Sequence, residues 1–302
     1  MATLAHLTEN GAGEVWFEGP ELYLPMTVKH LLGATINSLL KPVGVRLTRI
    51  AEINHLQRED RRKFLELIRE VEGMFQQANL SNLPSREGRT ELLAELFGTN
   101  VSEALYVLEY LHRALRLKGD VCEFGVAQGA TSTLMANEIR DTDKDLWLFD
   151  SFKGLPKPGA KDELIDDIFN LKSIEKYEGQ MAFPVTSVQA KLLRISFPAE
   201  RVKIVDGFIE DTVASSLLPD RVCFAYIDFD FYNPIRLALQ LLHERLAPGG
   251  FLVVDDYGFF SSGAKTAVDE FIEEHRDAYE LTLPPKFAGH FGILHRKKQE
   301  PH

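Results

Sequence analysis

Cysteine, basic residues and long apolar runs are all scarce in this chain of 302 residues. The two cysteines, Cys122 and Cys223, fall within apolar runs, so we expect buried free thiols and no disulfide or cysteine metal site. The 34 lysines and arginines are outnumbered by 45 aspartates and glutamates, and the net charge of -11 disfavours a nucleic-acid partner. No apolar run reaches the roughly 20 residues that span a bilayer, and no basic segment precedes an apolar stretch at the N-terminus. We therefore expect a soluble, cytoplasmic protein without a membrane span.

Strand-like and helix-like segments alternate from about Gly119 to the C-terminus. This order predicts an α/β fold with a doubly wound, mostly parallel, seven-stranded Rossmann-like sheet. A C-terminal hairpin, 279–283 and 291–295, predicts an antiparallel strand at the sheet edge. We expect a turn at Pro248-Gly249-Gly250. The other predicted strands are 120–124, 146–149, 202–205, 222–227 and 251–254, with helices at 129–140, 234–245 and 265–276.

Residues before Gly119 have helical patterns without strands, at 26–40, 58–77, 91–97 and 102–117. We expect residues 1–85 to form a helical N-terminal extension that packs on the core or supports a homo-oligomer. Residues 86–302 would form the main domain. Within that domain, residues 151–185 are rich in glycine and proline and then acidic, and a loop of this length is typical of a lid over a binding site.

Two acidic stretches follow predicted strands in the C-terminal half, Ile227-Asp228-Phe229-Asp230 and Val254-Asp255-Asp256-Tyr257. Because the carboxyl ends of parallel strands meet at one edge of a sheet, these carboxylates should lie close together. Oxygen ligands in such a group are typical of a hard divalent cation. For Asp230, the alternative is an N-cap for the helix that begins near Pro234.

A cofactor site is predicted where the first strand of the sheet meets its helix. Glu123 precedes Gly125 and Gly129, and a helix opens with Thr131 and Ser132, so backbone N–H groups can approach a ligand. Asp150 follows Gly129 at the interval at which an acid meets a ribose hydroxyl in nucleotide-binding units. The Asp206-Gly207 pair ends the third strand. A nicotinamide dinucleotide would require a third glycine in the loop, whereas S-adenosylmethionine requires an apolar slot and an acid for the ribose.

Five motifs together resemble the macrocin O-methyltransferase family over about Glu91 to His295: Gly119 to Val126, Leu148 to Pro156, Asp228 to Tyr232, Pro248 to Gly250 and Asp255 to Tyr257. The resemblance implies a class I methyltransferase that uses S-adenosylmethionine and has Mg²⁺ beside the acceptor. Asp228, Asp255 and Asp256 would then hold the metal. The implied cofactor-binding residues are Glu123, Gly125, Gly129, Thr131, Ser132, Asp150, Ser151, Phe152, Asp206, Gly207 and Asp228.

The function that this resemblance implies is methylation of a hydroxyl on a sugar or other vicinal diol, in a glycosylated or polyhydroxylated natural product. The metal would lower the pKa of the attacking oxygen. Asp228, Asp230 and His290 are candidates for the group that accepts the proton. Three alternatives remain open: a catechol-like or polyketide acceptor, a nicotinamide-dependent reductase, and a cofactor-binding scaffold without catalysis.

Overall fold

The computed structural model describes residues 6–9, 15–18, 50–77, 83–214, 218–285 and 288–298. The chain divides into two compact units, Met1–Phe64 and Leu65–His302. In the first unit, β1 (His6–Glu9) and β2 (Val15–Glu18) pair as antiparallel strands. The sequence patterns indicated helices alone there, because each strand is only four residues long. The predicted helix at 26–40 lies outside the described residues, and the domain boundary near residue 85 stays a prediction.

The helix predicted at 58–77 is confirmed as part of α2 (Ile50–Gln77). The segments predicted at 91–97 and 102–117 correspond to α3 (Arg89–Leu93) and α4 (Val101–Ala114). α4 begins at Asn100, whose side chain accepts a hydrogen bond from the N–H of Glu103 and so caps the helix. Among the described helices, none is long and apolar enough to cross a bilayer.

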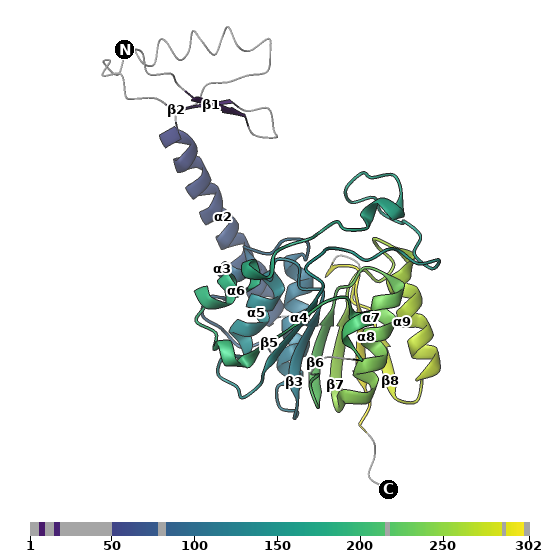
Figure 1. The fold of residues 1–302 in the computed structure, drawn as a ribbon. Coiled ribbons are helices and arrows are strands. Elements are labelled where there is room, and N and C mark those ends of the chain that lie inside the picture. The colour runs from purple at the N-terminus through teal and green to yellow at the C-terminus, as the bar shows by residue number, and fades with distance from the viewer. Residues whose placement is uncertain are drawn as a thin grey trace, which may run out of the picture. The chain divides into compact units, whose positions relative to one another are not determined.

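The second unit contains a seven-stranded sheet in the order β5-β4-β3-β6-β7-β9-β8 (Figure 1). The five strands from β5 to β7 are parallel, and β9 is antiparallel to both of its neighbours. The predicted α/β fold is therefore confirmed, with one refinement: β9 enters between β7 and the outermost strand, β8. The strands are β3 (Asp120–Phe124), β4 (Leu146–Asp150), β5 (Val202–Asp206), β6 (Val222–Ile227), β7 (Leu246–Val254), β8 (Tyr279–Thr282) and β9 (Gly292–Arg296).

The turn predicted at Pro248-Gly249-Gly250 lies within β7 as an irregularity of the strand. The register between β6 and β7 passes from Val222 opposite Leu246 to Phe224 opposite Phe251, so β7 carries extra residues at this point. Gly249 has φ of 86°, a left-handed conformation that suits glycine. The chain thus bulges without leaving the sheet, which explains why turn-forming residues are found inside a strand.

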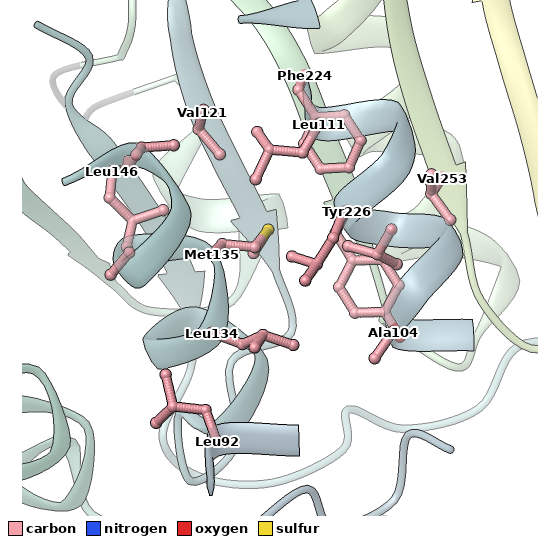
Figure 2. Close-up of a cluster of buried hydrophobic side chains, with 14 of the residues drawn as sticks. Leu92, Ala104, Leu111, Val121, Leu134, Met135, Leu146, Phe224, Tyr226 and Val253 are labelled. Carbon is pink, nitrogen blue, oxygen red and sulfur yellow. The ribbon is translucent and has the colours of Figure 1, made fainter. Parts of the chain in front are cut away.

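Helices cover both faces of the sheet (Figure 1). Alternate strand residues face opposite sides, and in β6 the side chains of Phe224 and Tyr226 enter one core whereas Ala225 and Ile227 enter the other. α3, α4, α5 (Ala130–Ile139) and α6 (Val185–Arg194) contribute to the first core, part of which is drawn in Figure 2. α7 (Ile209–Thr212), α8 (Tyr232–Arg245) and α9 (Ser262–Glu274) contribute to the second. This doubly wound arrangement leaves the carboxyl ends of the parallel strands free for a site.

The long segment between β4 and α6 has a small core of its own. Leu155, Ile174 and Tyr177 pack with Phe231 and Phe260, which belong to the segments after β6 and β7. The single turn of 3₁₀ helix at Ile174–Tyr177 supplies two of these side chains. This segment is therefore anchored beside the ends of β6 and β7, and its role as a lid stays a prediction.

Candidate active site

A cavity of about 350 Å³ lies at the carboxyl ends of β3 to β7. Its wall is formed by the segments that directly follow these five strands, by the 151–185 insertion and by Phe97 and Gly98 between α3 and α4. The predicted site residues Gly125, Asp150, Ser151 and Gly207 line the cavity. So do all four predicted acids of the C-terminal half, Asp228, Asp230, Asp255 and Asp256.

Gly125 is the point at which the segment after β3 approaches the end of β6. Its φ is 86°, and a Cβ atom there would lie only 1.9 Å from the carbonyl oxygen of Asp228. Any larger residue would therefore push the two strand ends apart. This contact brings the cofactor half of the predicted site against the acidic half, whereas the predicted approach of a ligand to Gly125 stays a prediction.

Asp150 holds the glycine loop through backbone hydrogen bonds. Its Oδ2 accepts from the N–H groups of Val126 and Ala127, over 2.7 and 2.9 Å, and its Oδ1 accepts from the N–H of Phe152 over 2.6 Å. Ala127 has φ of 47°, so the loop is held in a conformation that is uncommon for a residue other than glycine. The acid predicted to meet a ribose hydroxyl thus also shapes the loop in which a cofactor would lie.

Glu123 lies behind this loop and does not line the cavity. Its side chain is fully buried, and the hydroxyls of Thr131 and Ser132 each donate a hydrogen bond to its carboxylate. Burial raises the pKa of Glu123 to about 8, although the two hydroxyl hydrogen bonds oppose the shift. The predicted residues Glu123, Thr131 and Ser132 thus form one hydrogen-bonded group at the N-terminus of α5.

The remaining predicted cofactor residues surround the cavity without lining it. Gly129, with φ of 79°, is the N-cap of α5 and contacts Val188 of α6. Phe152 packs against the first core. Asp206 is paired with Asp150 across β5 and β4, but its side chain is exposed. Whether these three residues contact a cofactor stays a prediction.

Three carboxylates converge in the cavity. Asp228, Asp230 and Asp256 each place one oxygen within 4.8 Å of the others, a spacing close to the roughly 4–5 Å between opposite ligands of Mg²⁺ or Ca²⁺. Burial and then the negative charge of neighbouring aspartates raise the pKa of all three side chains well above the ordinary value. Asp230 and Asp256 also have left-handed backbones, with φ of 62° and 56°. Such unusual conformations gather at functional sites.

No basic side chain neutralises this group: among the described residues that line the cavity there is no lysine, arginine or histidine. The carboxylate of Asp228 also receives no hydrogen bond from any group in the described part of the chain. Half-buried carboxylates that lie this close together are costly unless a cation compensates their charge. The donor set, oxygen only and negatively charged, therefore fits a hard divalent cation.

Asp255, the third predicted metal ligand, is oriented differently. Its Oδ1 accepts from the N–H of Asp256 over 2.7 Å, and its Oδ2 accepts from the hydroxyl of Tyr226 over 2.8 Å. That hydroxyl also lies 3.1 Å from Oε1 of Glu103, a buried acid in the first turn of α4. Burial and then the charge of Asp255 raise the pKa of Glu103.

Sequence reasoning missed Tyr226 and Glu103. Tyr226 lies on β6, two positions before Asp228, which follows the strand, and this spacing is a signal for a shared face. Glu103 is 123 positions from Tyr226 and follows no motif. His290, the third candidate base, is exposed and does not line the cavity; its ring stacks on that of Phe259, which does, with centroids 4.8 Å apart.

The sequence model described as macrocin-O-methyltransferase (TylF) matches residues 108–297 of this chain. Over 181 residues, the chain is 31% identical to 8-demethyl-8-(2,3-dimethoxy-alpha-L-rhamnosyl)-tetracenomycin-C 4'-O-methyltransferase of Streptomyces olivaceus, a match that covers 59% of this chain and 66% of that protein. Over 171 residues it is 30% identical to mycinamicin III 3''-O-methyltransferase of Micromonospora griseorubida, covering 54% of this chain and 63% of that one. The chain thus spans slightly less than two thirds of these curated relatives.

The fold is also that of solved methyltransferases. The O-methyltransferase NovP superposes with a TM-score of 0.56 at 22% identity, covering 66% of this chain and 81% of that one. The calicheamicin methyltransferase CalS11 superposes with a TM-score of 0.52 at 18% identity, covering 77% and 91%. At these sequence identities, the two superpositions show that the fold is shared and nothing more.

Proposed function

Because this chain belongs to the macrocin O-methyltransferase family, we propose that it transfers a methyl group from S-adenosylmethionine to a hydroxyl of a sugar or other vicinal diol on a natural product. A divalent cation such as Mg²⁺ would be held by the aspartates after β6 and β7 and would activate the acceptor hydroxyl. The observation that carries this proposal is one cavity that joins the glycine loop after β3 to the uncompensated carboxylates after β6 and β7. The names of the two curated relatives, which act on sugar-bearing molecules, support the acceptor class.

The cofactor occupies the side of the cavity formed by Gly125, Asp150 and Gly207. Gly125 and Gly207 line this side of the cavity, and Oδ1 of Asp150 retains a lone pair for a ribose hydroxyl beyond its bond to Phe152. Glu123 acts indirectly, because it supports Thr131 and Ser132 beneath the loop. The sulfonium charge of the methyl donor is favoured on a wall that carries carboxylates and no cation from the described residues.

Asp228 and Asp256 would hold the cation, and Asp255 is the third ligand that the family resemblance implies. A bound divalent cation would supply the positive charge that lowers the pKa of the acceptor hydroxyl. Asp228 and Asp256 belong to the converging group, whereas Asp255 would have to rotate away from Tyr226 to join it.

Asp230 accepts the proton. With Asp228 and Asp256 assigned to the cation, Asp230 is the remaining carboxylate of the group and lines the same cavity, where it can act as the base. The acceptor oxygen forms a bond to the methyl carbon as the carbon–sulfur bond breaks, and the hydroxyl proton passes to Asp230. Because this is an in-line displacement, holding donor and acceptor in the cavity supplies much of the acceleration.

Chelation of the metal tests the proposal directly. With S-adenosylmethionine and a rhamnoside acceptor, we expect mass-spectrometric methyl transfer to stop in EDTA and to return with excess Mg²⁺. Asp228→Asn should abolish both turnover and calorimetric Mg²⁺ binding. Asp277→Asn, which makes the same charge change at an exposed position, is the matched control and should keep both. Full activity in the chelator would refute the metal role, and failure to bind S-adenosylhomocysteine would refute the reaction class.

A further inference from the structure

The backbone at Asp230 forms a tight and strained turn. The N–H of Phe231 donates to the carbonyl oxygen of Phe229 over 2.6 Å, which closes a three-residue γ-turn with Asp230 at its centre. Asp230 has φ of 62°, and γ-turns with a positive φ are rare and strained. Such a conformation persists only where the surrounding structure fixes it. Because Asp230 lines the cavity, the position of its carboxylate depends on the residues that fix this turn.

Ser261 fixes the turn from the segment that follows β7. Its hydroxyl donates to the carbonyl oxygen of Asp230 over 2.7 Å and accepts from the N–H of Gly263 over 3.1 Å. Ser261 is fully buried, and it is the N-cap of α9. One hydroxyl thus joins the backbone of Asp230 to the first turn of a helix.

Asp162 fixes the chain just beyond the turn, from the 151–185 insertion. Its Oδ1 accepts from the N–H of Tyr232, the first residue of α8, over 2.8 Å, and its Oδ2 accepts from the N–H of Gly159 over 2.7 Å. Asp162 is only 5% exposed and does not line the cavity. A Cβ atom on Gly263 would lie 1.9 Å from Oδ1 of Asp162, so α9 packs directly against this carboxylate.

The insertion is anchored to the start of α9 on both sides of Asp162. The hydroxyl of Ser262 donates to the carbonyl oxygen of Lys161 and accepts from the N–H of Glu163, both over 2.8 Å. The N–H of Ser262 donates to the carbonyl oxygen of Glu163 over 2.9 Å. The ammonium of Lys161 donates to the hydroxyl of Tyr232 over 2.9 Å. Asp162 therefore cannot leave the N-terminus of α8 unless several hydrogen bonds break.

From these contacts we propose that Asp162 and Ser261 are positioning residues that hold the carboxylate of Asp230 at the acceptor hydroxyl. This inference rests on the proposed function, in which Asp230 is the base, and it adds the insertion to the residues on which the chemical step depends. Neither residue lines the cavity, so each acts through the backbone of the turn. When either bond is lost, the strained turn relaxes and the base moves, whereas acceptor and cofactor keep their own contacts.

The separate effects on kcat and KM test this positioning. With a rhamnoside acceptor, we expect Asp162→Ala to lower kcat about a hundredfold and to leave KM and calorimetric affinity for S-adenosylhomocysteine within about twofold. Asp162→Asn keeps one acceptor oxygen, and Ser261→Ala removes one hydrogen bond, so each should lower kcat about tenfold. Asp166→Ala is the matched control, at an exposed aspartate of the same insertion that does not line the cavity, and it should change neither constant.

The Asp230→Asn background distinguishes positioning from a general structural role. Because residues that act as a unit are not additive, Asp162→Ala should lower kcat by less than about twofold once the base is gone. A full further loss there would overturn the inference, as would a rise in KM at constant kcat or unchanged kcat in both Asp162→Ala and Ser261→Ala. If Asp162→Ala does not fold, Asp162→Asn and Ser261→Ala decide by the same comparison.

Hydrogen exchange examines the same contacts without turnover. We expect the peptide 228–236 to exchange about tenfold faster in Asp162→Ala than in the unmodified chain, while a peptide of β3 stays unchanged. If no acceptor is methylated, or if Asp230→Asn keeps full activity, the proposed reaction or its base is wrong. Faster exchange would still show that Asp162 fixes the turn at Asp230, whereas equal exchange in the two proteins would contradict it.

Discussion

The acids on the two sides of the cavity differ in how the protein compensates their charge. On the side of β3 and β4, three backbone N–H groups donate to Asp150, and two hydroxyls donate to Glu123. On the side of β6 and β7, Asp228 has no donor among the described residues, and Asp230 lies against Asp256. The protein completes the first pair by itself. The second group requires a positive charge that the protein does not supply. Asp150 and Glu123 thus have a structural role, whereas Asp228, Asp230 and Asp256 are available to bind a cation.

Asp255 is intermediate between these two classes. It emerges from β7 beside Asp256, yet its carboxylate receives hydrogen bonds from Tyr226 and from the backbone, as the acids of the first side do. The positions of the two adjacent strand ends, those of β6 and β7, therefore do not determine which acids are available to a ligand. The direction of each side chain determines whether its carboxylate is available to a ligand. Substitution of one acid at a time can test this.

The largest effect is expected when the proposed base is removed. Asp230→Asn keeps the shape of the side chain but cannot accept the proton, so we expect kcat to fall about a thousandfold. Calorimetric Mg²⁺ affinity should stay within about threefold, whereas Asp255→Asn should weaken it more than tenfold. If Asp230→Asn weakens Mg²⁺ binding as much as Asp255→Asn does, Asp230 is the third ligand and a different base must be sought.

Removing Asp150 should affect the cofactor side selectively. Asp150→Ala leaves the N–H groups of Val126, Ala127 and Phe152 without their acceptor, so the glycine loop loses its conformation. We expect the dissociation constant of S-adenosylhomocysteine to rise about a hundredfold, since each lost buried hydrogen bond costs about 1–3 kcal/mol. Mg²⁺ affinity, measured in the same calorimeter without cofactor, should change little. An equal loss of both affinities would show that the two sides of the cavity are not separate.

The sequence predicted the fold well because its signals are local. β3 and β6 match the predicted 120–124 and 222–227, since each is a short apolar run bounded by turn residues. The same logic located the acids, because a residue that follows a parallel strand must lie at the carboxyl edge of the sheet. The place of β9 between β7 and β8 depends on hairpin pairing, which local patterns do not specify.

What the sequence could not provide is the direction of side chains and contacts between distant segments. Asp255 and Asp256 are adjacent, so their side chains point different ways, and only the structure shows that Asp255 meets Tyr226. Glu103 on α4 and Phe97 between α3 and α4 both reach the site from before the sheet, without any motif. The predicted cofactor contacts of Asp206 and Phe152 stay predictions, because the first side chain is exposed and the second packs in the core.

A difference in pH dependence should distinguish Glu123 from an ordinary acid. Its folded pKa of about 8 lies above the ordinary 4.5, so its contribution to stability is complete below 4.5 and is lost as the pH rises through about 8. Between about pH 6 and pH 7.5 the loss amounts to about 2 kcal/mol. Urea unfolding should show this slope in the unmodified chain and a flatter one in Glu123→Gln, which stays neutral. Equal slopes would mean that Glu123 is ionised in the folded protein.

The smallest expected effect tests whether the hydrogen bond from Tyr226 fixes the orientation of the Asp255 carboxylate. Tyr226→Phe removes only the hydroxyl that contacts Asp255 and Glu103, while the ring keeps its place in the core. If Asp255 must rotate away from Tyr226 to bind the cation, the variant frees it, and Mg²⁺ affinity should rise about threefold while affinity for S-adenosylhomocysteine stays constant. A loss of Mg²⁺ affinity would instead mean that the hydroxyl orients Asp255 as a ligand. A rise or a fall in Mg²⁺ affinity would each mean that Asp255 binds the metal. Unchanged affinity would mean that Asp255, like Asp150 and Glu123, has a structural role.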